Sequence, residues 1–250
     1  MSIIRRSYLL EAGFDPTKID SIAHRYLAAE SKVGTGAGGG TAPGIGDPVG
    51  RMFDQIGSAD LVAASSGQRP TLASVDGIVS ASFDGTDDQM EANSGLAISA
   101  PYTVVAVFYW PGRDEIVVYD PLWRLWAGSF PTLSSQVLLD YDTTGQDIYV
   151  VNDTANYGGD LTDAAARWLS IEVANRDDGS DTIMSSGETY SSATSVVHTD
   201  PTALLFGGIS VAGRYYSGAL AELLIFDDEL SADERAIVTG YIAETYGDLS

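Results

Sequence analysis

The sequence contains no cysteine among its 250 residues. Disulfide bonds, thiolate catalysis and cysteine-based zinc sites are therefore excluded. Histidine is almost as scarce: His24 and His198 are the only two, which is too few for a histidine-rich metal site. No apolar run approaches the length of a membrane-spanning helix, and Arg5 and Arg6 interrupt the first ten residues, where a secretory signal needs an apolar run. We therefore expect the chain to be made in a cytoplasm and to have no membrane insertion.

Basic residues are also few. Thirteen lysines and arginines face 35 acidic residues, which gives a formal net charge of −22. A field of that sign repels phosphate backbones and anionic membrane surfaces, so we expect no nucleic-acid partner. A well-solvated acidic surface explains the charge, as does adaptation to high salt, where self-repulsion is screened.

The chain has enough apolar material for a large core, with 44% hydrophobic and 10% aromatic residues. From about Arg51 onward the pattern has a period of two, which is typical of half-buried strands. Residues 102–110 alternate with both faces largely apolar, which predicts a central strand covered on both sides. Further strands are predicted at residues 78–83, 115–119, 136–141, 148–152, 168–174, 181–184, 203–209 and 220–226. This spacing, with no helices between, favours an all-β sandwich or barrel.

One helix is predicted near the C-terminus. Ser231 and Glu234 form a capping box, in which each side chain satisfies a backbone N–H of the other residue. An apolar face follows, and Gly247 supplies the stop. The residues of that face are Ile237, Val238, Tyr241, Ile242 and Tyr246. We expect this amphipathic helix to lie against the sandwich.

The first 50 residues differ from the rest. Residues 1–32 carry a net charge of +1, against −23 for the remainder, and we interpret them as an N-terminal arm. Asp15 and Pro16 are typical of a short helix start. Residues 33–50 are rich in Gly and Pro and predict a loop; no helix follows its formal G-x-G-x-x-G, so a dinucleotide site is disfavoured. Residues 51–250 then form the sandwich, although a single domain from about residue 14 is the alternative.

Several of these segments together resemble a known family. The motif Phe83-Asp84-Gly85-Thr86-Asp87-Asp88, the Arg-Pro-Thr-Leu of residues 69–72, residues 101–107 and residues 222–235 are similar to concanavalin A-like (laminin-G-like) jelly-roll domains of tailed-phage and marine bacterial proteins. The resemblance extends over residues 14–249. It implies a two-sheet jelly-roll sandwich with one C-terminal amphipathic helix. For function it implies attachment, as in fibre heads, capsid decorations, adhesins and lectins.

The leading functional prediction is a non-enzymatic virion structural protein. It would be a capsid decoration, head spike or tail fibre module of a bacteriophage, located in the virion and forming a homo-oligomer. Its partners would be capsid or tail proteins, contacted through the arm. The candidate docking residues there are Ile3, Ile4, Arg5, Arg6 and Tyr8.

Two alternatives involve sugars. A lectin or adhesin that binds a host-surface glycan needs an exposed aromatic ring beside amide groups; the candidates are Trp110, Trp123, Trp126, Asn152, Asn156 and Tyr157. Packing at one end of the core is the competing explanation for Trp123 and Trp126. A glycan hydrolase is the third interpretation. The Glu-x-Asp-x-Glu strand of glucanases that share this fold is absent, and Glu115, Glu172 and Glu222 stand alone on their strands, so only two carboxylates that meet in one groove would indicate hydrolysis.

Calcium is the one cofactor that the residues suggest. Asp84, Asp87 and Asp88 cluster at a predicted turn, and hard cations bind several carboxylate oxygens. The same motif is ordinary turn chemistry, because Asp side chains bond to their own backbone. No full ligand loop is present, and no catalytic residue is assigned.

Overall fold

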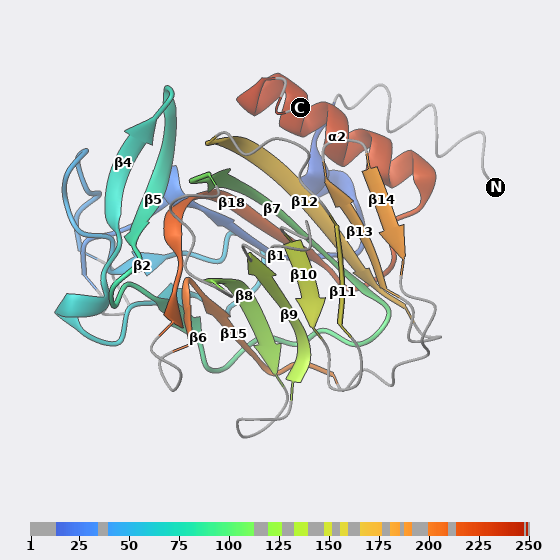
Figure 1. Ribbon diagram of the computed structural model, residues 1–250, viewed down its shortest axis with the longest axis horizontal. Coiled ribbons are helices and arrows are strands. Elements are labelled where there is room, and N and C mark those ends of the chain that lie inside the picture. Colours follow the sequence, from blue (N-terminus) through green and yellow to red (C-terminus); the bar gives the residue numbers. More distant parts are fainter. Residues whose placement is uncertain are drawn as a thin grey trace.

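In the computed structural model, the protein is an all-β sandwich of two eight-stranded antiparallel sheets (Figure 1). The structure describes residues 14–34, 40–112, 120–126, 133–139, 148–151, 156–159, 166–176, 181–185, 188–191, 200–209, 214–247 and 249. Within these residues it has one α-helix, α2 (Ala232–Tyr246), and none that is long and apolar enough to cross a membrane.

The first sheet, sheet A, has the order β14-β13-β12-β7-β18-β5-β4, and β1 also pairs with β18. Its strands are β1 (Ile22–Leu27), β4 (Thr71–Val75), β5 (Ile78–Asp84), β7 (Tyr102–Trp110), β12 (Arg167–Asn175), β13 (Asp181–Ser185), β14 (Glu188–Ser191) and β18 (Ser217–Phe226). The central position of β7, between β12 and β18, confirms the prediction from its two apolar faces.

The second sheet, sheet B, has the order β11-β10-β9-β8-β15-β6-β3-β2, so β2 forms one edge. Its strands are β2 (Arg51–Met52), β3 (Leu61–Val62), β6 (Met90–Ala92), β8 (Asp120–Trp126), β9 (Leu133–Leu139), β10 (Ile148–Val151), β11 (Asn156–Gly159) and β15 (Ala203–Phe206). A separate pair joins β16 (Gly208–Ile209) to β17 (Arg214–Tyr215). The predicted strand at residues 115–119 lies outside the described residues.

The main core lies between the two sheets. Alternate residues of β7, including Phe108 and Trp110, point into it together with Trp123 and Phe206 of sheet B. The other face of β7, with Val105 and Val107, belongs to a second cluster under α2. Each strand thus divides its side chains between an inner and an outer face, as period-two alternation requires.

Helix α2 covers the outer face of sheet A (Figure 1). The predicted capping box is present: the Ser231 side chain accepts from the Glu234 N–H, and the Glu234 carboxylate accepts from the Ser231 N–H at 3.0 Å. Ile237, Val238 and Ile242 are buried against the sheet. The helix ends at Gly247, as predicted.

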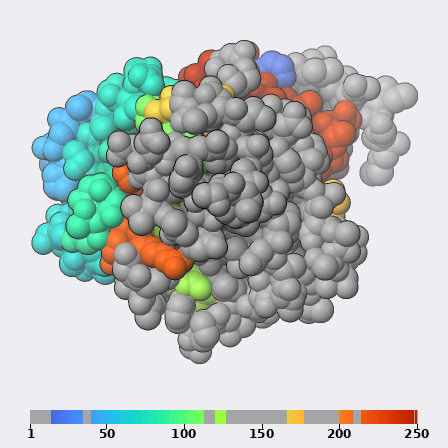
Figure 2. All heavy atoms as spheres, in the orientation of Figure 1, coloured from blue at the N-terminus to red at the C-terminus, as the bar shows by residue number. Residues whose placement is uncertain are grey.

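The segment predicted as an N-terminal arm contains sandwich structure from residue 14 onward. Asp15 caps the short 3-10 helix η1 (Pro16–Lys18), with Pro16 at its first position. The chain then enters β1, where His24 and Tyr26 are buried at alternate positions. Two further 3-10 turns follow, η2 (Ala28–Glu30) and η3 (Ser66–Gln68). In Figure 2, the light-blue to cyan part of the chain, which includes β4 and β5, forms the left side of the molecule, and α2 lies along its upper edge.

Candidate functional site

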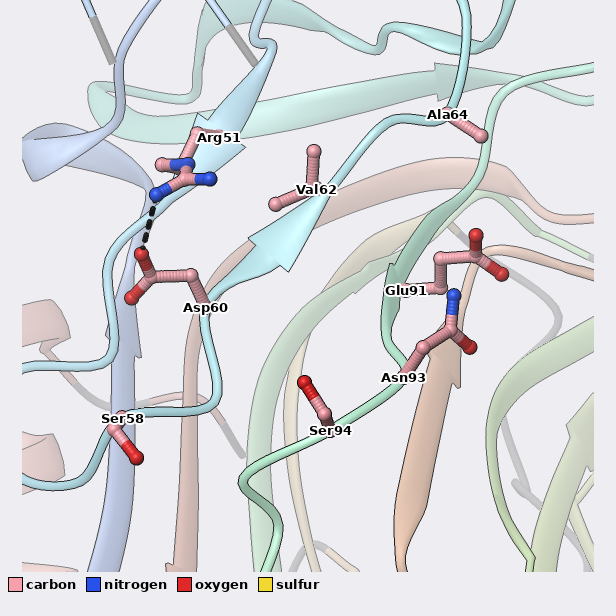
Figure 3. Close-up of a pocket in the computed structure, with 8 residues that line it drawn as sticks. All are labelled: Arg51, Ser58, Asp60, Val62, Ala64, Glu91, Asn93 and Ser94. Carbon is pink, nitrogen blue, oxygen red and sulfur yellow. Dashed lines mark hydrogen bonds and ion pairs between the residues drawn. The ribbon is translucent and has the colours of Figure 1, made fainter. Parts of the chain in front are cut away.

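A polar pocket of about 360 Å³ lies on the outer face of sheet B, at its β2 edge. Its lining residues are Arg51, Ser58, Asp60, Val62, Ala64, Glu91, Asn93 and Ser94 (Figure 3). In Figure 3, Arg51 and Asp60 lie on one side of Val62, and Glu91 and Asn93 lie on the other. The volume is within the range of small-molecule sites.

Strand alternation explains why these side chains converge. Met52, Leu61 and Met90 point into the core, so their neighbours point outward. The registers then align Arg51, Val62 and Glu91 in one row across three strands, because Val62 pairs with both Arg51 and Glu91.

The acidic and basic groups of the pocket differ in their partners. Arg51 Nη1 donates to Asp60 Oδ2 at 2.8 Å, and the Arg51 guanidinium lies 5.8 Å from the centre of the Phe53 ring. Asp60 Oδ1 accepts from the Asp54 N–H at 2.9 Å. By contrast, the half-buried Glu91 carboxylate has no hydrogen-bond or ion-pair partner among the described residues. Glu91 is therefore the carboxylate of the pocket that remains available to accept from a ligand.

The wall that carries Ser58 and Asp60 is held by a buried pair. His24 Nδ1 lies 2.6 Å from Asp54 Oδ2, and the Asp54 carboxylate also accepts from the N–H groups of Gly57 and Ala59. Burial by itself raises the pKa of Asp54, but these hydrogen bonds outweigh it and hold the pKa at about 2. Asp54 therefore stays ionised and fixes the loop in one conformation.

Two glycines allow the wall to pack this closely. A Cβ at Gly57 would lie 2.5 Å from Asp54 Oδ2 and 2.7 Å from His24 Nδ1. Gly95 has φ +84°, and a Cβ there would lie 3.0 Å from the Ser58 carbonyl oxygen. The loop after β6 consequently approaches the Ser58 loop and brings Asn93 and Ser94 to the pocket.

The aromatic residues predicted to stack on a sugar do not form this site. Trp110 and Trp123 are fully buried in the core, so that prediction is corrected for both. Trp126, at the end of β8, is half-buried. Asn156 and Tyr157 belong to β11. Asn152 and the arm residues Ile3, Ile4, Arg5, Arg6 and Tyr8 lie outside the described residues.

The three aspartates of the predicted turn do meet. Carboxylate oxygens of Asp84, Asp87 and Asp88 lie within 4.8 Å of one another. Asp84 Oδ1 accepts from the Thr86 N–H at 2.8 Å, and Asp88 Oδ2 accepts from the Asp84 N–H at 3.0 Å. These are the side-chain to backbone bonds of an ordinary turn, which is the alternative to a calcium site. Burial, and then the charges of Asp84 and Asp87, raise the pKa of Asp88 to about 6.

Two of the isolated glutamates have structural roles. Glu222 accepts from Arg25 at 2.7 Å, from Tyr241 at 2.8 Å and from Tyr246 at 2.7 Å. Glu172 accepts from Arg235 of α2 at 2.7 Å. Both carboxylates are thus used in holding α2 to sheet A, whereas Glu115 lies outside the described residues.

The pocket was not predicted from the sequence. The signal in the sequence is that the lining residues stand at every second position, where strand side chains share one face. These residues are Asp60, Val62 and Ala64 in one segment, and Glu91 and Asn93 in the other. β2, β3 and β6 are only two or three residues long, so that alternation cannot be recognised before the pairing is known.

Comparison with known proteins supports the fold. No protein-family model matches the chain, and no curated protein matches its sequence. Among solved structures, the whole chain superposes on 39% of Trypanosoma rangeli sialidase with a TM-score of 0.60 and 10% identity. It also superposes over 78% of its length on 51% of an arabinofuranosidase complexed with arabinofuranosyl-α-1,2-xylobiose, with a TM-score of 0.59 and 12% identity. The chain thus spans about two fifths of the sialidase and half of the arabinofuranosidase.

These comparisons correct the functional prediction. The chain was predicted to be a non-enzymatic structural protein of a bacteriophage particle. The sialidase and the arabinofuranosidase are both glycosidases, so the prediction of a non-enzymatic virion structural protein is wrong. At 10–12% identity the likeness shows the β-sandwich that this chain shares with parts of carbohydrate-active enzymes.

Proposed function

We propose that the chain is a carbohydrate-binding β-sandwich, of the jelly-roll type that its sequence resembles, which takes a sugar into the pocket on sheet B. The observation that carries the proposal is the Glu91 carboxylate, which has no partner among the described residues and lines the pocket beside Asn93, across Val62 from Asp60. Convergent acceptors and donors on a fixed scaffold are what a polyhydroxylated ligand requires.

The remaining lining suits the same ligand. Val62 and Ala64 provide small apolar surfaces against the C–H groups of a sugar ring, and Ser58 and Ser94 provide hydroxyls. Carboxylate and amide oxygens accept hydrogen bonds from sugar hydroxyls, and those to a charged acceptor are the stronger.

The names of the fold neighbours point to the same ligand class. One is a sialidase, and the other was crystallised with an arabinofuranosyl xylobiose. This chain spans only part of each, so binding rather than turnover is the primary proposal.

Binding is tested with a panel of methyl glycosides and short oligosaccharides, measured by saturation-transfer NMR and calorimetry. At least one sugar should bind the native protein, and Glu91→Ala should weaken that binding by about ten-fold or more, equivalent to about 1.4 kcal/mol. Glu244→Ala removes the same charge from the exposed face of α2 and should leave binding unchanged. Equal weakening in both variants, or no binding by the native protein, would refute the proposal.

Hydrolysis is the second candidate, favoured by two carboxylates in one pocket, the arrangement that would indicate an enzyme. Asp60, ion-paired with Arg51, would act as nucleophile or base, and Glu91 as the acid. A panel of 4-nitrophenyl glycosides, including the α-L-arabinofuranoside, tests it. Release of nitrophenol that is lost in both Asp60→Asn and Glu91→Gln would support hydrolysis; release that survives both variants, or no release from a glycoside shown to bind, would exclude it.

A further inference from the structure

We infer that the pocket selects neutral sugars and rejects sugar acids such as uronic and sialic acids, an inference that rests on the proposed glycan binding. It concerns the charge of the ligand, which neither the fold nor the neighbours determine. The selectivity follows from how the three ionisable residues of the pocket are placed.

The lining carries more negative than positive charge. Asp60 and Glu91 contribute two carboxylates, and Arg51 contributes the one guanidinium of the lining (Figure 3). A ligand carboxylate would therefore add a third negative charge to a pocket that already holds an excess of one.

The guanidinium of Arg51 already has a carboxylate partner. Arg51 Nη1 lies 2.8 Å from Asp60 Oδ2, and the Arg51 side chain is only 15% exposed. A sugar acid that competed for Arg51 would leave Asp60 partly buried beside an incoming anion, which costs more than a new ion pair returns.

Asp60 cannot turn away to make room at little cost. Its second oxygen accepts from the Asp54 N–H at 2.9 Å, and Asp54 is anchored by His24 and by the N–H groups of Gly57 and Ala59. The Arg51–Asp60 pair is therefore part of a fixed wall and is not available for exchange with a ligand carboxylate.

Glu91 also favours neutral sugars over sugar acids. An acceptor without a partner among the described residues suits the hydroxyl donors of a neutral sugar and repels a carboxylate at close range. The net charge of −22 adds a long-range repulsion that salt can screen.

The test uses matched pairs of methyl glycosides, each a neutral hexose and the uronic acid of the same ring stereochemistry, together with N-acetylneuraminic acid. Affinities are measured by calorimetry at low ionic strength, about 0.01 M, where the Debye length is about 30 Å. We expect the neutral member of a binding pair to bind about ten-fold or more tightly than its acid. Glu91→Gln should narrow that ratio, and Glu244→Gln should leave it unchanged.

The outcomes separate the two claims. A sugar acid that binds as tightly as its neutral partner would overturn the inference and leave the glycan-binding proposal intact. A ratio that Glu91→Gln does not alter would also overturn the proposed role of charge. If no sugar of either class binds, the proposed function itself fails, and the inference fails with it.

Discussion

The outer faces of the two sheets both carry a glutamate, but the two glutamates differ in their hydrogen-bond partners. On sheet A, Glu222 is 1% exposed and each of its oxygens is bonded to donors from β1 or α2. On sheet B, Glu91 is half-buried at the pocket and has no partner among the described residues. A strand glutamate whose oxygens all have donors thus holds the fold together, whereas one left available at a pocket is a candidate for ligand binding.

The largest loss of stability is expected from a substitution on sheet A. Glu222→Ala removes the counterion of Arg25 and the acceptor of Tyr241 and Tyr246, and an uncompensated buried charge is costly. We expect the free energy of unfolding, measured by urea titration, to fall by about 3 kcal/mol. Glu91→Ala should change it by less than about 0.5 kcal/mol. Equal losses in the two variants would remove the distinction between the two faces.

A second prediction concerns the wall of the pocket. Gly57→Ala places a Cβ within 3 Å of Asp54, His24 and the Ala23 carbonyl oxygen, so the loop must shift. We expect a loss of about 2 kcal/mol in stability together with weaker sugar binding, because the same loop carries Ser58 and Asp60. Sugar affinity that stays native in the folded variant would show that this loop does not position the site.

Asp54 and Asp88 should respond to pH in opposite directions. The pKa of Asp54 is lowered from 3.8 to about 2, so its stabilising contribution is present above pH 3.8 and is lost as pH falls towards 2. The pKa of Asp88 is raised to about 6, so its contribution is present below pH 3.8 and is lost as pH rises through 6.

Urea titrations between pH 2 and pH 6 test both signs. Asp54→Asn should abolish the part of the acid-side loss that depends on Asp54, and Asp88→Asn should flatten the decline toward pH 6. A pH profile that is unchanged in either variant would contradict the assigned role of that carboxylate.

The smallest effect is expected at the start of α2. Ser231→Ala removes the side chain that accepts from the Glu234 N–H, and lost caps of this kind cost about 1 kcal/mol. Thermal unfolding monitored by circular dichroism should show a modest decrease in the midpoint. Sugar affinity should not change, since α2 covers the opposite sheet.

The elements that local chemistry specifies could be predicted from the sequence. β7 matches its predicted bounds because nine residues of alternation are enough to reveal a strand, and α2 does so because its capping box and Gly247 are local signals. The pocket could not be predicted, since Arg51, Asp60 and Glu91 meet only when three very short strands pair. Trp110 and Trp123 were misjudged because burial is decided by tertiary packing and cannot be deduced from neighbouring turn residues.

The most direct test of the central claim is an NMR titration of ¹⁵N-labelled protein with a neutral sugar that binds. We predict saturable shifts concentrated on β2, β3 and β6, with the side-chain amide of Asn93 among the largest. Saturable shifts that cluster elsewhere, such as around Trp126 or on α2, with the pocket resonances unmoved, would contradict sugar binding at this pocket.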